Sequence, residues 1–423
     1  MRHPAPPSPR PEPTAAAHHA TDRHTSGSPV PTPPTTRQIT AAQAIPVPRP
    51  PSTQQITAPQ ATQELRASVR KLLDREAEPW PALCAQVGVA ALTVPERFGG
   101  FATEPATQPA DPADPSHRAS LIRPSKSTDS ADPAHPDQSI GLAEVQIVAE
   151  ELGRNLTDVP FLGSSVLAVT SLLSTPNTGA PALARLLPAL AEGTVGALAW
   201  TADGRRDPLQ PAFTADESTV DGTAHYVLDA ADADVLLAAA RTPDGPALFE
   251  VDPARPGVRR EPVPTRDETR HLATVTLDQV RARPLGRVDL ARVRDVACAV
   301  LAAEQVGAAS RALELTVEYT RQRVQFGRPI GSFQALKHRM ADLHVLVETS
   351  RSAAYASPAS PRLAAVAKVH CSEVFSEVTA EMMQLHGGIA ITWDHPAHRY
   401  FKRAHAAAQL FGAPHHHLSR VHP

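Results

Sequence analysis

Apolar residues recur at helical spacing in the first folded part of the chain. Leu65, Val69 and Leu72 fall on one face of a helix, and we expect Pro79 to end it because proline breaks the helical hydrogen-bond ladder. Further apolar stretches with the same period predict helices at residues 81–89, 141–153, 163–173 and 180–191. The pattern therefore predicts an N-terminal α-helical domain over residues 61–195.

The period of the apolar positions changes from residue 196 onward. Residues 219–228 alternate as strands do, and Asp221-Gly222 predicts a hairpin turn in their middle. Short strands are also expected at residues 235–240, 247–251 and 273–277. We interpret residues 196–288 as a middle domain built on a small β-sheet or barrel.

Helical periodicity returns after Asp289 and continues almost to the end of the chain. Long helices are predicted at residues 290–324, 333–356, 360–388 and 396–411, which is typical of a four-helix bundle over residues 289–423. Residues 296–309 are rich in alanine, and small side chains there favour a wide cavity beside the helix. The expected fold class is an α+β multidomain chain of N-terminal helices, middle β domain and C-terminal bundle.

Two proline-rich segments interrupt this pattern and account for many of the chain's 44 prolines. Residues 1–60 contain few large apolar side chains, so they indicate a disordered extension or a start codon assigned too early. Residues 103–137 have a similar composition and indicate a flexible insertion in the N-terminal domain.

Composition limits the class of partner. The formal net charge is −3 and the two signs are interspersed, so neither nucleic acid nor an anionic membrane is an expected partner. We find no apolar stretch typical of a membrane anchor or a secretory signal. Cys84, Cys298 and Cys371 are far apart and odd in number, which favours reduced thiols in the cytoplasm over a disulfide framework or a metal site.

Four stretches in fixed order resemble the acyl-CoA dehydrogenase family. They are residues 88–100 with 149–154, residues 220–228 with 273–278, residues 319–334, and residues 384–388 followed by Thr392, Pro396 and Lys402. The resemblance covers nearly the whole chain outside the proline-rich segments. It implies an oxidoreductase that uses FAD to form a double bond between the α and β carbons of an acyl-CoA thioester. It also implies a tetramer and an electron-transfer flavoprotein or another acceptor.

The third and fourth stretches contain the candidate FAD-binding residues. They supply one cation, one aromatic face, three amides and two glycines: Arg323, Phe326, Gln325, Gln334, Gln384, Gly387 and Gly388. A pyrophosphate needs a cation and closely approaching backbone, and an adenine needs a flat apolar face. The alternative interpretation is a solvated arginine, a core phenylalanine and a simple helix stop. The resemblance implies that these residues serve the FAD of a neighbouring subunit.

Other positions depart from the family pattern. The carboxylate that removes the substrate's α proton usually precedes a Gly-Thr pair, and Phe411 stands at that position. A second location used in the family corresponds to Ala297, so the catalytic residue is unknown. Glu304 lies two helical turns after Ala297, where a structural role is favoured over catalysis. The loop at residues 199–207 and Leu228 replace groups that usually surround the flavin within the subunit.

This asymmetry favours the base-lacking subunit of a heterotetrameric acyl-CoA dehydrogenase. Three alternatives remain: a self-sufficient homotetramer that uses Glu304 or another carboxylate, a non-catalytic acyl-CoA-binding scaffold, and a flavoenzyme with different chemistry. The adjacent His415, His416 and His417 lack ligand spacing, so we expect a solvated tail there and no metal.

Overall fold

The computed structural model describes residues 60–76, 78–102, 142–176, 181–201, 209–216 and 218–421. The predicted disordered extension and the predicted insertion at residues 103–137 lie outside these ranges, as does most of the loop at residues 199–207. The described residues belong to one compact unit.

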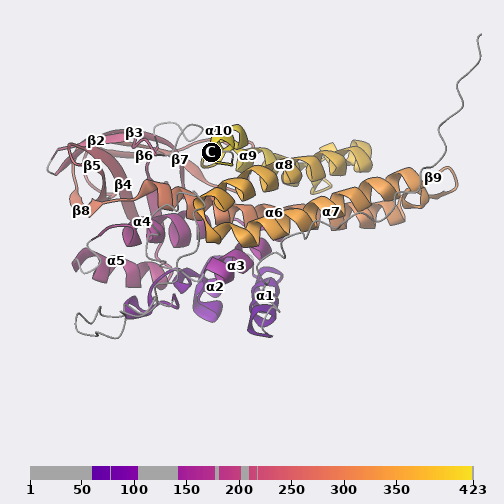
Figure 1. Ribbon diagram of the computed structural model, residues 1–423, viewed down its shortest axis with the longest axis horizontal. Helices are drawn as coiled ribbons and strands as arrows, with labels where there is room; N and C mark the ends of the chain where they lie inside the picture. The colour runs from indigo at the N-terminus through magenta and orange to yellow at the C-terminus, as the bar shows by residue number, and fades with distance from the viewer. Residues whose placement is uncertain are drawn as a thin grey trace, which may run out of the picture. The chain divides into compact units, whose positions relative to one another are not determined.

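The N-terminal part is helical, as the apolar pattern predicts (Figure 1). Its elements are α1 (Gln60–Leu73), α2 (Pro79–Val87), α3 (Leu142–Asn155), the π-helix Phe161–Ala168, α4 (Val169–Leu173) and α5 (Pro181–Ala191). Short 3-10 turns at Val89–Ala91 and Glu96–Phe98 follow α2. Pro79 begins α2 and does not end the first helix, because proline's fixed φ and missing N–H suit the first helical position.

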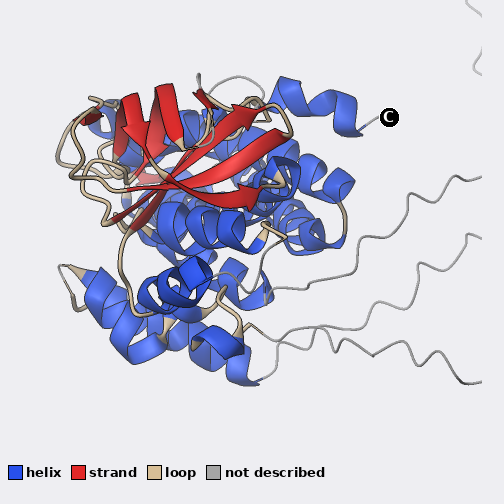
Figure 2. Ribbon diagram, turned by 90° about the vertical axis from the view of Figure 1, so that its left-hand side faces the viewer, coloured by secondary structure: helices blue, strands red, loops and turns tan. Residues whose placement is uncertain are grey.

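Eight strands form one open, mixed sheet, which Figure 2 shows with helices packed behind it. The strands are β1 (Gly196–Ala199), β2 (Phe213–Ala215), β3 (Thr219–Leu228), β4 (Val235–Thr242), β5 (Gly245–Val251), β6 (Val258–Pro262), β7 (Leu272–Arg281) and β8 (Arg283–Arg287). Their order is β6-β7-β3-β2-β4-β5-β8, with β1 paired to β4. Among the described strands no ladder joins β6 to β8, so the sheet does not close into a barrel.

The hairpin predicted within residues 219–228 is wrong. These residues form the single strand β3, which pairs with β7 along its length. Asp221-Gly222 lies at a shift of register between the two strands, and Gly222 has φ 139°. Glycine here accommodates a β-bulge, and a bulge shares its sequence signature with a turn.

The bundle contains the four predicted helices and one more. They are α6 (Leu290–Gln322), α7 (Gln334–Ala356), α8 (Pro361–His386) and α9 (Ala397–Gln409), followed by α10 (Pro414–Val421). Helix α6 is long and apolar enough to cross a membrane by composition alone, but 89% of its most apolar window is buried inside the protein. Burial against α3, α7 and α8 accounts for this apolar character.

Small residues let α3 and α6 approach at backbone distance. A Cβ added to Gly307 would lie 1.8 Å from the carbonyl oxygen of Glu150, and one added to Gly153 would lie 2.0 Å from that of Glu304. The alanine-rich residues 296–309 are buried throughout. They serve close helix packing, so the expectation of a wide cavity beside them is wrong.

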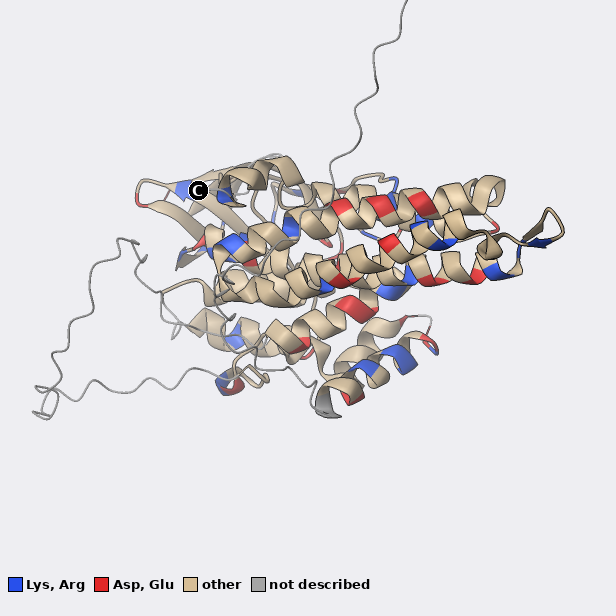
Figure 3. Ribbon diagram, turned by 45° about the vertical axis from the view of Figure 1, so that its right-hand side comes forward, with Lys and Arg blue, Asp and Glu red and all other residues tan. Residues whose placement is uncertain are grey.

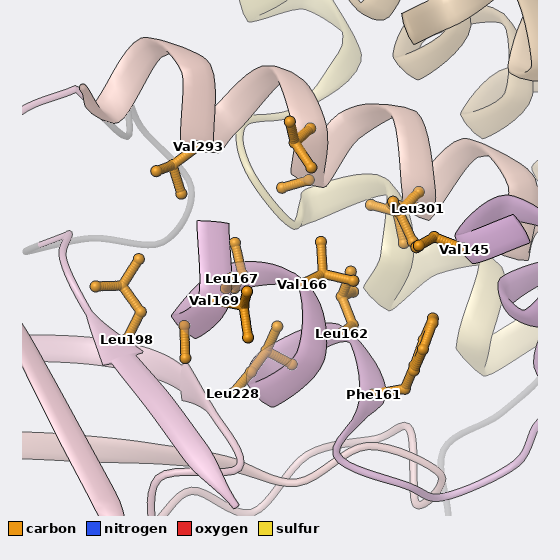
Figure 4. Close-up of a cluster of buried hydrophobic side chains, with 14 of the residues drawn as sticks. Val145, Phe161, Leu162, Val166, Leu167, Val169, Leu198, Leu228, Val293 and Leu301 are labelled. Carbon is orange, nitrogen blue, oxygen red and sulfur yellow. The ribbon is translucent and has the colours of Figure 1, made fainter. Parts of the chain in front are cut away.

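One apolar core connects the N-terminal helices, the sheet and the bundle. Figure 4 shows Leu162 of the π-helix, Leu198 of β1, Leu228 of β3 and Leu301 of α6 among the buried side chains that form it. The sheet's other face has its own cluster around Phe213. The position of β3 relative to α6 is therefore fixed by packing.

We expect Gly307→Ala to lower the free energy of unfolding by about 1–3 kcal/mol, because a methyl group would force α3 and α6 apart. Urea unfolding checks this. Gly388→Ala is the control: its Cβ would meet nothing within 4 Å, so we expect a change below about 0.5 kcal/mol. Equal effects at both positions would contradict the close-packing account.

Candidate functional site

The residues predicted to bind FAD gather at one end of the bundle. Arg323 is the C-cap of α6, and β9 (Val324–Gln325) and β10 (Arg328–Pro329) form a hairpin beyond it (Figure 1). The turn of this hairpin has positive φ at both central residues, 55° at Phe326 and 77° at Gly327, as a two-residue β-turn requires. The Phe326 side chain is 92% exposed, so the alternative of a core phenylalanine is wrong.

Helix α8 ends at the same end of the bundle. It stops at His386, and Gly387 follows with φ 64°. A Cβ on Gly387 or Gly388 would meet nothing within 4 Å, so the main chain there is open to a ligand. The hydroxyl of Tyr319 on α6 donates to the carbonyl oxygen of His386 at 3.3 Å, which joins the two helix ends.

Three exposed amides complete this surface. Gln325 lies on the hairpin, Gln334 begins α7, and Gln384 lies in the last turn of α8. Arg323 is exposed and makes no ion pair with any described residue. We refer to the seven predicted residues together as the bundle-tip surface. Figure 3 shows Lys and Arg positions at this hairpin.

A second candidate region lies where the bundle meets the sheet. Phe411, which stands where the family usually has its base, is 5% exposed. Its ring packs edge-on against Trp200, with centroids 6.1 Å apart. Tyr226 and Leu228 are among the other residues that line the cavity beside these rings, which is about 20 Å³, about one water-sized sphere.

Two buried side chains hold the turn that carries Phe411. His417 Nε2 donates to the Phe411 carbonyl oxygen at 2.9 Å. Lys368 Nζ donates to the carbonyl oxygens of Ala407 and Ala408 at 3.1 and 3.0 Å, at the end of α9. Burial lowers the pKa of Lys368 to about 8 and that of His417 to about 4.

The expectation of a solvated histidine tail is therefore wrong for His417. It is 3% exposed, it lies on α10, and its ring is fixed between Phe411 and Arg420. Arg420 in turn bonds to Asp295 of α6 at 2.5 Å. Sequence spacing missed this role because the ring is buried by α10 folding back on α6 and α8. No three His, Cys, Asp or Glu side chains in the described ranges form a metal-binding group.

Glu304 is held by two arginines. Its Oε1 accepts from Arg270 at 2.6 Å and from Arg403 at 3.1 Å, and all three residues are buried. Arg403 also donates to the carbonyl oxygen and the hydroxyl of Thr269. A carboxylate fixed in this way is a structural tie between α6, α9 and the β6–β7 loop. The predicted preference for a structural role agrees with these contacts.

Asp229 lies beside this ion cluster at the end of β3. It has a left-handed φ of 57°, and its Oδ2 lies so close to Gly163 of the π-helix that a Cβ there would come within 2.3 Å. Burial raises the pKa of Asp229 to about 7, against the opposing field of Arg270. Sequence reasoning missed Asp229, Arg270 and Trp200, because nothing in their spacing indicates that they meet.

The two regions are far apart within one chain. Glu304 and Ala297 lie in the first half of α6 and Arg323 follows its end. The 18 residue steps from Glu304 to Gln322 span about 27 Å at about 1.5 Å per residue. Ala297 is fully buried in the core. The bundle-tip surface therefore lies well beyond the reach of any side chain at Glu304.

These features define a three-part α+β chain with an open surface at the bundle tip and a filled pocket beside the sheet. The family model for the acyl-CoA dehydrogenase C-terminal domain matches residues 295–422. Acyl-CoA dehydrogenase IpdE2 of Mycolicibacterium smegmatis is 38% identical over 85% of this chain and 91% of its own length. IpdE2 of Mycobacterium tuberculosis is 37% identical over 85% of this chain and 95% of its own.

Solved structures agree. The Tcur3481-Tcur3483 steroid ACAD variant matches with a TM-score of 0.69 at 28% identity, over 85% of this chain and 96% of its own. The ChsE4-ChsE5 complex from Mycobacterium tuberculosis matches with a TM-score of 0.68 at 26% identity, over 86% and 96%. The chain belongs to the acyl-CoA dehydrogenase family, a family of FAD-dependent oxidoreductases that act on CH–CH groups.

We expect Asp229→Asn to stabilise the protein more at pH 8 than at pH 4.5. The folded pKa of Asp229 is about 7 and its ordinary value is 3.8, so the folded state binds more protons between these values. Stability conferred by the protonated carboxyl is therefore lost as pH rises from 4 to 7. Asparagine removes this loss, and its advantage in Tm should grow by at least about 2–4 °C between the two pH values. An advantage independent of pH would contradict the assignment. Asp244→Asn serves as control, because Asp244 is exposed in the turn between β4 and β5.

Proposed function

We propose that this chain is the base-lacking subunit of a heterotetrameric acyl-CoA dehydrogenase. In this role it completes the FAD site of a partner subunit, and the partner removes the α proton of an acyl-CoA thioester. The observation that carries the proposal is the packing of Phe411 on Trp200, which fills the place where the chain's own base would stand.

The bundle-tip surface fits an FAD molecule held by another subunit. Arg323, which pairs with no carboxylate in the described ranges, offers a cation to a pyrophosphate, and the open main chain at Gly387 and Gly388 allows phosphate oxygens to approach. Phe326 offers an exposed ring to an adenine. Gln325, Gln334 and Gln384 offer amide donors and acceptors. When bound, FAD would accept the hydride that leaves the β carbon of the acyl group.

A second copy of this chain is a poor partner for that surface. In such a copy, the pocket beside the sheet would have only about 20 Å³ of free volume, because Phe411, Trp200 and Leu228 line it. No carboxylate occupies position 297 or 411, and Glu304 is neutralised by Arg270 and Arg403. A related chain that retains an open flavin pocket and a base would supply what this one lacks.

Two structural relatives support pairing with a different chain. The ChsE4-ChsE5 complex and the Tcur3481-Tcur3483 steroid ACAD each carry two chain names, and both match along nearly their whole length. By analogy we place this chain in a complex with a second acyl-CoA dehydrogenase-like subunit, in the cytoplasm. An electron-transfer flavoprotein or another acceptor would take the electrons.

The proposal predicts a difference between the lone chain and the complex. We expect the purified chain to be colourless and inactive, and co-expression with an adjacent acyl-CoA dehydrogenase gene to yield a yellow complex with one FAD per pair of chains. Flavin absorbance against protein concentration gives the ratio. Full FAD occupancy and turnover by the lone chain would overturn the proposal, and a colourless complex would favour the scaffold alternative.

Within such a complex we expect Arg323→Gln to weaken FAD retention about tenfold, the loss expected for a charge-assisted hydrogen bond of about 1.5 kcal/mol. Equilibrium dialysis of the complex measures this. Arg321→Gln is the matched control, because Arg321 is an exposed cation two residues earlier on α6. Equal losses in both variants would point to general charge and not to a contact made by Arg323.

A further inference from the structure

Three aromatic rings lie next to one another where α8 ends, just before the Gly387-Gly388 turn. The rings of Tyr319 and His386 stack with centroids 4.3 Å apart, and those of His386 and His395 lie 4.4 Å apart. His386 immediately precedes Gly387, and its carbonyl oxygen accepts from Tyr319. The ring cluster is therefore linked to the open backbone of Gly387 and Gly388 through His386, the residue that precedes Gly387.

The hydrogen bond of His395 requires a neutral ring, whereas that of His386 to Met382 can form in either state and partly offsets the effect of burial on the pKa of His386. His386 is therefore kept neutral by the surroundings of its other nitrogen. His386 Nδ1 donates to the carbonyl oxygen of Met382 at 2.8 Å, and its buried Nε2 has no hydrogen-bond partner among the described residues. A proton on Nε2 would be a buried donor without an acceptor, which is costly. His395 Nδ1 accepts from the backbone N–H of Ala397 at the start of α9 at 3.1 Å. A proton there would remove that bond and place positive charge at a helix N-terminus.

The surroundings oppose protonation further. Burial lowers the pKa of His386 and of His395 below the ordinary value, and each is also opposed by a neighbouring imidazole, His395 for the first and His398 for the second. His398 faces Arg399 and Lys402 on α9 and Glu268 of the β6–β7 loop. Lys402 is itself paired with Glu268 at 3.0 Å and lies over the ring of Trp393 at 4.6 Å. Tyr319 is the titratable group that packs on His386 from α6.

We propose that the Tyr319–His386–His395 ring cluster is an acid-sensitive latch that holds the turn carrying Gly387 and Gly388 against the bundle. With both rings neutral, the turn packs on His386 and α9 keeps its N-terminal hydrogen bond. Protonation brings two positive rings into contact, removes the acceptor for Ala397, and releases residues 387–396 from the bundle. The effect on FAD rests on the proposed function, in which the segment is part of the surface that receives the partner's FAD. Mild acid would then weaken FAD binding by releasing that segment.

The direction of the pH effect follows from linkage. The folded pKa of each imidazole is below its ordinary value of 6.5, so the unfolded segment binds more protons. The stability of the latch is present above pH 6.5 and is lost as pH falls through that value towards the folded pKa. Each pKa unit of difference changes the opening equilibrium by about tenfold.

Hydrogen exchange measured by mass spectrometry on the full chain tests the latch. With the intrinsic rate corrected for pH, we expect protection of residues 387–397 to fall by about tenfold or more from pH 7.5 to pH 5, while the middle of α6 stays protected. His395→Asn should reduce this fall, because asparagine can accept from the Ala397 N–H without titrating. His344→Asn is the matched control: His344 is exposed on α7, so that variant should respond as the native chain does.

A second measurement guards against a variant that fails to fold. NMR titration of the native chain should give pKa values for His386 and His395 below the ordinary value of 6.5. Unchanged protection in acid, or the same acid response in His395→Asn as in the native chain, would overturn the latch. Both readings come from the chain alone and without FAD, so they stand if the heterotetramer proposal fails. If the complex loses FAD in acid while the hydrogen-exchange protection of residues 387–397 stays unchanged, the latch is refuted. The assignment of the FAD site would then still stand.

Discussion

The close packing of α6 against α3 is the constraint on which the rest of the structure depends. Gly153 and Gly307 bring the two backbones together at a distance that no side chain at either position would allow. This contact buries α6 almost completely over its first two-thirds. One rigid helix then carries Glu304 beside the sheet at one end and Arg323 into solvent at the other.

Buried charges close the end of the bundle that faces the sheet. Glu304 between Arg270 and Arg403 removes the freedom a catalytic carboxylate would need, and these groups hold one another because an unpaired ion in a low-dielectric interior is costly. Lys368 has no carboxylate partner among the described residues. Its ammonium group donates hydrogen bonds to carbonyl oxygens at the end of α9 and so fixes the turn at Phe411. The pocket is filled by side chains with supporting contacts of their own.

The opposite end of the bundle has the reverse character. Phe326, Gly387 and Gly388 leave apolar surface and main chain exposed, where an isolated protein would normally bury or cover them. The contrast between one filled pocket and one open surface is the physical basis for assigning the chain a role in another subunit's site. The ring cluster beside the open surface adds a response to pH that a site built only from arginine and amides would lack.

Sequence periodicity was sufficient to predict the order of helical domain, β domain and helical bundle, because helical and strand periods are local properties of each segment. The helices predicted at residues 290–324, 333–356 and 360–388 end or begin within two residues of the observed bounds, beside Arg323, Gln334 and Gly387. Whether these residues bind FAD stays a prediction. The sequence could not distinguish a bulge from a turn at Asp221-Gly222, nor close packing from a cavity at residues 296–309.

Only the tertiary structure decided which distant residues meet. The pairing of Trp200 with Phe411, of Glu304 with Arg270 and Arg403, and of His417 with the Phe411 carbonyl joins segments far apart in the chain. No local pattern encodes such contacts, because they depend on how α6, α9 and β1 pack. The sequence by itself determined that a phenyl ring stands where a base is expected; the packing around that ring decided that the place is filled.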